Sequence, residues 1–224
     1  MSQSLAEVTS TLTAAGAPFE IEEVEIRGVP TRTWKNTPPS LRAVLEGSRL
    51  HGEKTFLVYE DERLSFSEHW NAAARLARTL AEEWGVAKGD RVAIAMRNLP
   101  EWSIAFWAAT TAGAVAVPLN AWWKGEELEY GLSDSGAEVL FCDAERAYRL
   151  APHFDGLGLR KIVVARDQAP PVAGQLRFEE VLAGAPPEAA LPELALQPED
   201  DATIFYTSGT TGKPKGALGT HRNI

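Results

Sequence analysis

The sequence predicts an α/β protein with a mainly parallel β-sheet and helices on both of its faces. Three observations lead to this prediction: short apolar runs typical of buried strands, helical segments that alternate with them, and capping residues at the helix starts and stops. The composition agrees with it. With 45% hydrophobic and 24% charged residues, the chain is near the globular average, which excludes a disordered or fibrous protein.

Charge and cysteine content narrow the class further. The 22 basic and 31 acidic residues give a net charge of −9, which argues against nucleic-acid binding, since phosphate neutralisation needs a basic surface. Cys142 is the only cysteine, so neither an intramolecular disulfide nor a Cys-rich zinc site can form. No Lys or Arg precedes Arg27, so a basic signal-peptide region is missing and we expect a cytoplasmic protein.

Residues 1–50 are expected to form an arm with a short helix. Leu5, Val8 and Leu12 have helical spacing, and Ser40 can cap a helix that begins at Leu41. The prolines among residues 30–39 argue against a continuous element there.

Residues 51–166 are expected to form a first α/β sheet region. A hairpin is predicted at 55–59 and 63–66, and Ser65 with Glu68 forms a capping box for a helix that ends near Gly85. Further strands are predicted at 91–96, 115–117, 139–142 and 162–165, and further helices at 100–111, 126–132 and 144–150.

One uncharged stretch, residues 102–123, is long enough on paper to span a bilayer. Its Thr, Gly and Pro residues and a change of period midway instead predict a buried helix, a turn and a buried strand, with no transmembrane segment.

Residues 167–200 read as a connection, with a short helix at 178–182. Residues 201–224 are expected to begin a second sheet region, with a strand at 202–206 that leads into a loop. This loop contains three glycines, four hydroxyl side chains and two lysines: Gly209, Gly212, Gly216, Thr207, Ser208, Thr210, Thr211, Lys213 and Lys215. Glycines let backbone amides approach a ligand, and hydroxyls and lysines bind phosphate oxygens, so the loop predicts a polyphosphate site.

The loop is not the P-loop of NTPases. Thr207 stands where that motif requires its first Gly, and Pro214 follows Lys213 where it requires Ser or Thr. From composition alone, a flexible Gly/Ser/Thr surface turn is an equal alternative.

The full string resolves this choice. Residues 206–216 resemble the phosphate-binding signature of the adenylate-forming enzymes, a family of acyl-CoA synthetases, luciferases and peptide-synthetase adenylation domains, and residues 221–223 resemble its continuation. Segments upstream also resemble the family: 89–94, 98–102, 112–115, 117–120 and 134–137. The resemblance begins near residue 37 and is closest to fatty-acid–CoA ligases. It implies the amino-terminal part of the large domain of such an enzyme.

The resemblance also implies a reaction and its site. A carboxylic acid, such as a fatty acid, is joined to AMP from ATP with Mg²⁺ and then passed to coenzyme A as a thioester. The implied phosphate cradle consists of Thr207, Ser208, Gly209, Thr210, Thr211 and Gly212, with Lys215 as the preferred phosphate cation. Lys213 ranks below Lys215 because the family varies there, and Thr207 is also a candidate Mg²⁺ ligand.

The later signatures of the family are not found before Ile224, so no catalytic residue is assigned within this chain. We expect the chain alone to be inactive and its parent to be an AMP-forming acyl-CoA ligase, with a homodimer as a further expectation. Two alternatives stay open: a non-catalytic nucleotide- or partner-binding module, and one half of a split protein.

Other conspicuous residues have plain structural interpretations. His221 is expected to pack or cap a helix rather than act as a general base, and Cys142 to be a small core residue. Trp102, Trp107, Trp122 and Trp123 are interpreted as packing residues rather than as an acyl pocket.

Overall fold

The structure is a computed structural model that describes residues 4–168, 174–185, 190–207 and 212–224. Its chain divides into two units, Met1–Pro39 and Ser40–Ile224, and each is described by itself. The helix that follows Ser40, predicted together with the arm, therefore belongs to the larger unit.

The first unit begins with helix α1 (Leu5–Thr13), where the sequence predicts one. Ser4 caps this helix: its hydroxyl accepts from the Glu7 amide, and the Glu7 carboxylate accepts from the Ser4 amide at 2.8 Å. This reciprocal pair satisfies two amides that a helix start leaves unbonded.

An antiparallel hairpin of β1 (Ile21–Ile26) and β2 (Val29–Trp34) follows, closed by Arg27 and Gly28 with φ values of 52° and 80°. Two positive φ values in a two-residue turn suit the twist of a hairpin. The expectation of no continuous element around Pro30 is wrong. Pro30 stands opposite Glu25 in this two-stranded sheet, one pair away from the turn. Its backbone nitrogen points away from β1, so its missing N–H costs no hydrogen bond between the strands.

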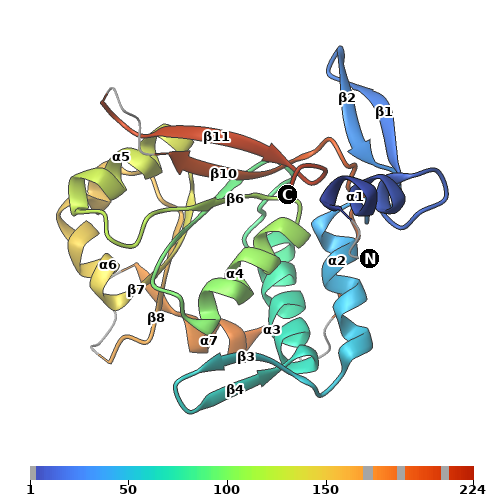
Figure 1. Ribbon diagram of the computed structural model, residues 1–224. Helices are drawn as coiled ribbons and strands as arrows, with labels where there is room; N and C mark the ends of the chain where they lie inside the picture. The colour runs from blue at the N-terminus through green and yellow to red at the C-terminus, as the bar shows by residue number, and fades with distance from the viewer. Residues whose placement is uncertain (1–3, 169–173, 186–189, 208–211) are drawn as a thin grey trace. The chain divides into compact units, whose positions relative to one another are not determined.

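The second unit is built on a seven-stranded sheet with the order β11-β10-β6-β5-β7-β8-β9 (Figure 1). Every neighbouring pair is parallel except β10 with β11, which is antiparallel. The strands are β5 (Arg91–Ala95), β6 (Val115–Pro118), β7 (Val139–Asp143), β8 (Lys161–Ala165), β9 (Gln175–Arg177), β10 (Asp201–Thr207) and β11 (Lys215–Thr220). The mainly parallel sheet confirms the predicted fold class.

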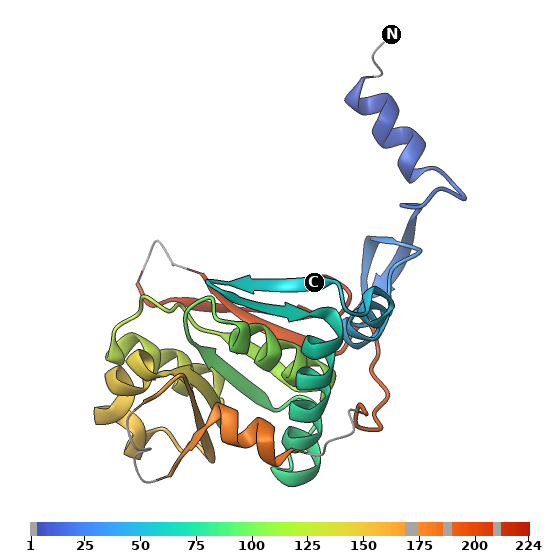
Figure 2. The ribbon, with the colours of Figure 1, turned by 90° about the horizontal axis from the view of Figure 1, so that it is seen from below.

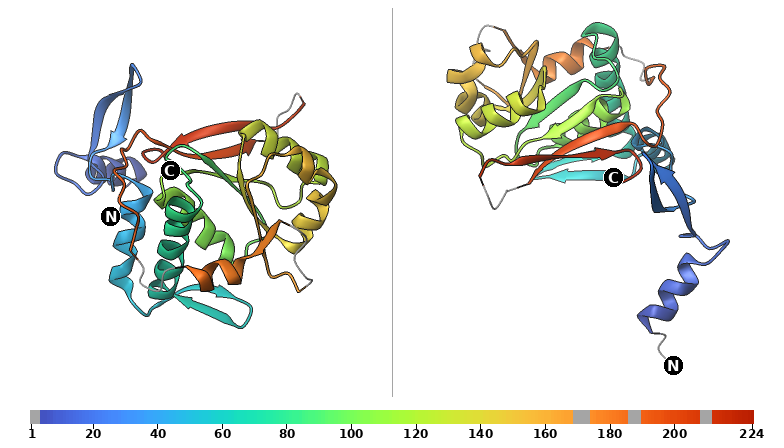
Figure 3. Two further views of the ribbon diagram at one scale, coloured as in Figure 1. Left: turned by 180° about the vertical axis from the view of Figure 1, so that it is seen from behind. Right: turned by 90° about the horizontal axis from the view of Figure 1, so that it is seen from above.

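Helices cover both faces of this sheet (Figures 2 and 3). On one face lie α3 (Phe66–Arg78), α4 (Pro100–Thr111) and α7 (Phe178–Gly184), and on the other lie α5 (Gly125–Ser135) and α6 (Ala144–Leu150). The central strand β5 supplies both cores, because Val92 and Ile94 face the first set of helices while Ala93 and Ala95 face the second.

The remaining elements lie around this framework. They are α2 (Leu41–Ser48), the hairpin β3 (Thr55–Tyr59) with β4 (Glu62–Ser65), the short helices Arg49–His51 and Ala151–Gly156, and a π-helical turn, Thr79–Glu83, that extends α3. The capping box at Ser65 and Glu68 is present, as predicted.

The carboxyl-terminal part differs from the prediction. Residues 201–224 do not begin a second sheet: Thr203 of β10 pairs with Ala116 of β6, so β10 and β11 extend the one sheet. Ala202 and Thr203 are buried at this position, and burial of these residues stabilises the pairing of β10 with the sheet. Strands β9 and β11 are not predicted from the sequence.

The uncharged stretch forms the predicted buried helix and strand, α4 and β6, joined by a turn with Gly113 at a φ of 81°. Within the described ranges, no helix combines the length and the apolar character that crossing a membrane requires.

Candidate functional site

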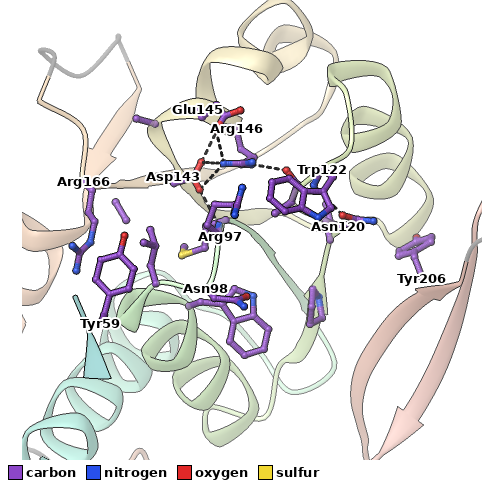
Figure 4. A pocket seen from close by; sticks show the side chains of 18 of the residues that line it. Tyr59, Arg97, Asn98, Asn120, Trp122, Asp143, Glu145, Arg146, Arg166 and Tyr206 are labelled. Atoms are coloured by element: carbon purple, nitrogen blue, oxygen red, sulfur yellow. Dashed lines mark hydrogen bonds and ion pairs between the residues drawn. The ribbon is translucent and has the colours of Figure 1, made fainter. Parts of the chain in front are cut away.

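A pocket of about 840 Å³ lies at the carboxyl ends of five parallel strands, β5, β6, β7, β8 and β10 (Figure 4). Strand β5 precedes both of its neighbours in the chain, with β6 on one side and β7 on the other. The connections from this point therefore run in opposite directions, which leaves a crevice outside the strand ends. Open α/β sheets bind ligands at such switch points.

Three arginines line the pocket, and two of them are neutralised by carboxylates. Arg146 is 1% exposed, and its Nη1 lies 3.1 and 3.0 Å from the two carboxylate oxygens of Asp143. Its Nε donates to the carbonyl of Ala121 at 2.8 Å, while its Nη2 is buried with no partner among the described residues. Arg146 thus fixes the loop after β6 against the end of β7.

The carboxylate of Asp143 binds two backbone amides in addition to the Arg146 guanidinium. It accepts from the backbone amide of Arg97, at 2.9 Å, and from that of Arg146, where it caps α6. Asp143 therefore ties together the carboxyl ends of β5 and β7, the two strands that flank the switch point.

Arg166 closes the opposite side of the pocket. Its guanidinium pairs with Glu62 at 2.7 Å and with Glu101 at 2.9 Å, and it lies over the ring of Tyr59. The hydrogen bond from Arg166 holds the pKa of the Glu62 carboxyl below its usual value. These contacts make Arg166 a cross-link between β8, the β3–β4 hairpin and α4.

Arg97 stacks its guanidinium 3.5 Å from the centre of the Trp122 ring. Trp122 is 64% exposed, so of the two packing roles expected for the tryptophans, core and inter-subdomain packing, the core role does not apply to Trp122. The loop that carries Trp122 is fixed on both sides of it, because Arg146 donates to the carbonyl of Ala121 and Arg149 to that of Trp123. A cation and a large planar ring at the mouth of the pocket suit a ligand with an anionic group and an aromatic ring.

The predicted phosphate cradle falls at the tip of the β10–β11 hairpin. Ser208, Gly209, Thr210 and Thr211 lie outside the described residues. Of the other predicted residues, Thr207 ends β10 opposite Lys215 at the start of β11, and both side chains are exposed. Gly212 has a φ of 136°, a backbone conformation that residues with a side chain rarely adopt. The space beside its Cα is open. This arrangement of a hydroxyl, a cation and a permissive backbone fits a phosphate group.

Tyr206 connects the hairpin to the pocket. It lines the pocket, and its hydroxyl donates to Asp134 at 2.7 Å. Burial, together with the nearby Asp134 carboxylate, raises the pKa of the Tyr206 phenol well above its usual value, so this group remains a hydrogen-bond donor.

The plain interpretations of His221 and Cys142 agree with the structure. Nδ1 of the buried His221 accepts from the amide of Leu41, the first residue of α2, and so caps that helix. Cys142 is buried in β7, and burial raises the pKa of its thiol, which removes nucleophilic character. The described residues contain no group of three His, Cys, Asp or Glu placed to hold a metal ion.

The pocket residues Arg97, Asp143 and Arg146 are not predicted from the sequence as site residues. One signal could have identified them, because each follows or ends a predicted parallel strand, where ligands of such sheets bind.

This fold, with a pocket at the carboxyl edge of a mainly parallel sheet, defines a ligand-binding α/β protein. Residues 46–224 match the AMP-binding enzyme family, and the chain belongs to that family.

Two curated relatives of the chain are CoA ligases. The chain is 36% identical over 168 residues to long-chain-fatty-acid–CoA ligase FadD13 of Mycobacterium tuberculosis, a match over 73% of this chain and 31% of that protein. It is 32% identical over 160 residues to 4-coumarate–CoA ligase 2 of Oryza sativa subsp. japonica, over 67% of this chain and 28% of the relative. The chain thus spans about a third of the length of these curated relatives.

Solved structures give the same result. The anthranilate–CoA ligase AuaEII in complex with anthranoyl-AMP superimposes with a TM-score of 0.77 at 29% identity, covering 84% of this chain and 36% of the other. The amino-terminal domain of FACL13 from Mycobacterium tuberculosis superimposes with a TM-score of 0.67 at 30% identity, covering 82% of this chain and 45% of the other.

Proposed function

We propose that this chain is part of an AMP-forming ligase that activates a carboxylic acid with ATP and transfers it to coenzyme A. The observation that carries the proposal is the family match over residues 46–224, since the named relatives of that family are CoA ligases. Because these relatives join different acids to CoA, the proposal goes no further than a carboxylic acid as substrate.

The proposed reaction has two steps. A carboxylate oxygen attacks the α-phosphorus of ATP and the bond to pyrophosphate breaks, which leaves an acyl-adenylate. The sulfur of coenzyme A then attacks the acyl carbon and AMP departs. Both steps depend chiefly on positioning and on stabilising charge on phosphate oxygens.

The hairpin tip would serve the first step. Lys215 would place a positive charge beside the leaving pyrophosphate, and the backbone at Gly212 would let an amide approach it. Thr207 offers one exposed hydroxyl oxygen, which fits a Mg²⁺ ion that arrives with the nucleotide and takes its other ligands from phosphates and water. Such an ion would neutralise phosphate charge.

The pocket would serve the thiol donor. Coenzyme A carries an adenine ring and a phosphate at one end, and the stacked pair of Arg97 and Trp122 offers a partner for each. The volume of the pocket, about 840 Å³, is ample for a nucleotide.

We further propose that this chain does not complete the reaction alone, because it spans only about a third of its relatives. A cytoplasmic location and a homodimer stay predictions from the sequence.

Two measurements on this chain test the proposal: calorimetric binding of Mg·ATP and of pyrophosphate, and ATP–pyrophosphate exchange with a panel of aromatic and fatty acids. We expect the chain to bind Mg·ATP and pyrophosphate, and the two ligands to compete with each other. We expect no ATP–pyrophosphate exchange. Robust exchange would contradict the statement that the chain is insufficient. Absence of any phosphate binding would contradict the assignment of the hairpin tip.

A further inference from the structure

Helix α5 lies beside the end of the β10–β11 hairpin at which the two strands are connected (Figure 1). The two strands reach that end at Thr207 and Lys215, which pair in register. Each strand is bonded there to the same helix, through two tyrosines and one aspartate.

The first bond joins β10 to α5. The hydroxyl of Tyr206 donates to a carboxylate oxygen of Asp134 at 2.7 Å, and the carbonyl of Gly131 lies 3.3 Å from the same hydroxyl. A bond from a phenol to a charged carboxylate is stronger than one between neutral groups. The residue directly before Thr207 is therefore held to the helix.

The second bond joins α5 to the chain that leads into β11. The hydroxyl of Tyr130 lies 3.1 Å from the carbonyl of Pro214 and 3.4 Å from the other carboxylate oxygen of Asp134. A phenol has one hydrogen, and the shorter distance favours the Pro214 carbonyl as its acceptor. The ammonium of Lys213 also lies 4.8 Å from the centre of the Tyr130 ring, within range of a cation–π contact.

Helix α5 is a firm support for these bonds. Leu128 and Leu132 are buried in the core beneath it, and Gly136 ends it in the left-handed conformation with a φ of 64°. The start of β11 has little support of its own, because it is an edge strand whose residues 215–218 are exposed.

We propose that Tyr130 and Asp134 are positioning residues for phosphate binding: they fix the ends of β10 and β11 so that Thr207 and Lys215 are already in place when a phosphate arrives. This inference rests on the proposed function of the hairpin tip. Its physical basis is that groups ordered before binding lose less conformational entropy on binding, and so bind more tightly.

The test compares Tyr130→Phe, Asp134→Asn and a control, Tyr148→Phe, which alters an 83% exposed tyrosine on α6. Calorimetry measures the affinity for pyrophosphate. Thermal unfolding measures the melting temperature with and without pyrophosphate, and hydrogen exchange measures the backbone amides within residues 212–216, where Pro214 has none.

We expect Tyr130→Phe and Asp134→Asn to weaken pyrophosphate binding about fivefold, the worth of one hydrogen bond, and to speed exchange at residues 212–216. The melting temperature without ligand should stay within about 3 °C of the unaltered chain, because the core is untouched. A merely structural role would instead lower that temperature and leave affinity unchanged in the folded protein. Tyr148→Phe should change none of these quantities.

Unchanged affinity and exchange in both α5 variants would overturn the inference. If the unaltered chain binds no pyrophosphate, the proposed function of the hairpin tip fails. In that case hydrogen exchange by itself tests whether Tyr130 positions the chain before β11. Faster exchange in Tyr130→Phe but not in Tyr148→Phe supports this positioning role, and equal exchange in the two variants rejects it.

Discussion

The carboxylate of Asp143 accepts two hydrogen bonds, of 3.1 and 3.0 Å, from one nitrogen of the buried Arg146 guanidinium. The pair stands at the junction of β7 and α6, and Arg146 also binds the carbonyl of Ala121 in the loop after β6. The floor of the pocket thus depends on one ion pair that water hardly reaches.

Replacing Arg146 with Met should lower the free energy of unfolding by about 3 to 5 kcal/mol, because the Asp143 carboxylate would be left without its counter-charge. Urea unfolding measures this. Arg78→Met is the matched control: Arg78, the last residue of α3, forms a surface pair with Glu82 in the π-helical turn that follows, and its loss should cost less than about 1 kcal/mol. Equal losses in the two variants would show that burial gives the Arg146 pair no special weight.

His69 should make stability depend on pH. Burial lowers the pKa of its imidazole from 6.5 to about 4, although a hydrogen bond to the backbone of Ser103 opposes the shift. The imidazole Nε2 also lies 2.9 Å from the Ser103 hydroxyl. Above pH 6.5 the ring is neutral in both the folded and the unfolded chain. Between pH 6.5 and 4 only the unfolded chain takes up the proton, so His69 should remove about 3 kcal/mol from the free energy of unfolding as the pH falls.

The measurement is urea unfolding at several values of pH between 4 and 7. His69→Gln keeps a polar partner for Ser103 but cannot titrate, so its stability should fall less steeply with acid than that of the unaltered chain. His51→Gln, at an exposed histidine, is the control. Parallel stability curves for the unaltered chain and His69→Gln would exclude this role.

Lys215→Ala should weaken pyrophosphate binding about tenfold without unfolding the protein, because the variant removes a charged partner of phosphate from an exposed strand end. It should also flatten the dependence of affinity on salt. Calorimetry at two salt concentrations measures both effects, with Lys54→Ala, at another exposed lysine, as the control. Affinity equal to that of the unaltered chain would remove Lys215 from the site.

Trp122→Leu should weaken binding of adenosine 3′,5′-bisphosphate, the nucleotide end of coenzyme A, about tenfold, since a stacked ring is lost. The melting temperature should hardly change because Trp122 is 64% exposed. Trp34→Leu, at a half-exposed tryptophan in the first unit, is the comparison. If both variants bind the nucleotide as the unaltered chain does, the pocket is not the site of the thiol donor.

The sequence predicts best those elements whose causes are local. Helix α4 runs from Pro100 to Thr111 as expected, because proline suits a first helical turn and Gly113 beyond its end takes a positive φ. The box of Ser65 and Glu68 likewise fixes the start of α3 through bonds three residues apart.

The string that resembles the family signature, residues 206–216, also lies in one continuous segment, so the sequence by itself determines the family. Only the tertiary structure decided that β10 joins β6 in one sheet, since that pairing brings together residues as far apart as Thr203 and Ala116. The pocket has the same origin. Arg97 and Trp122 meet because β5 and β6 are neighbours whose ends share one edge, and the carboxylate that orders this edge, Asp143, comes from β7. Local propensity carries no information about which strands become neighbours, because burial of both sheet faces selects the pairing for the whole chain at once.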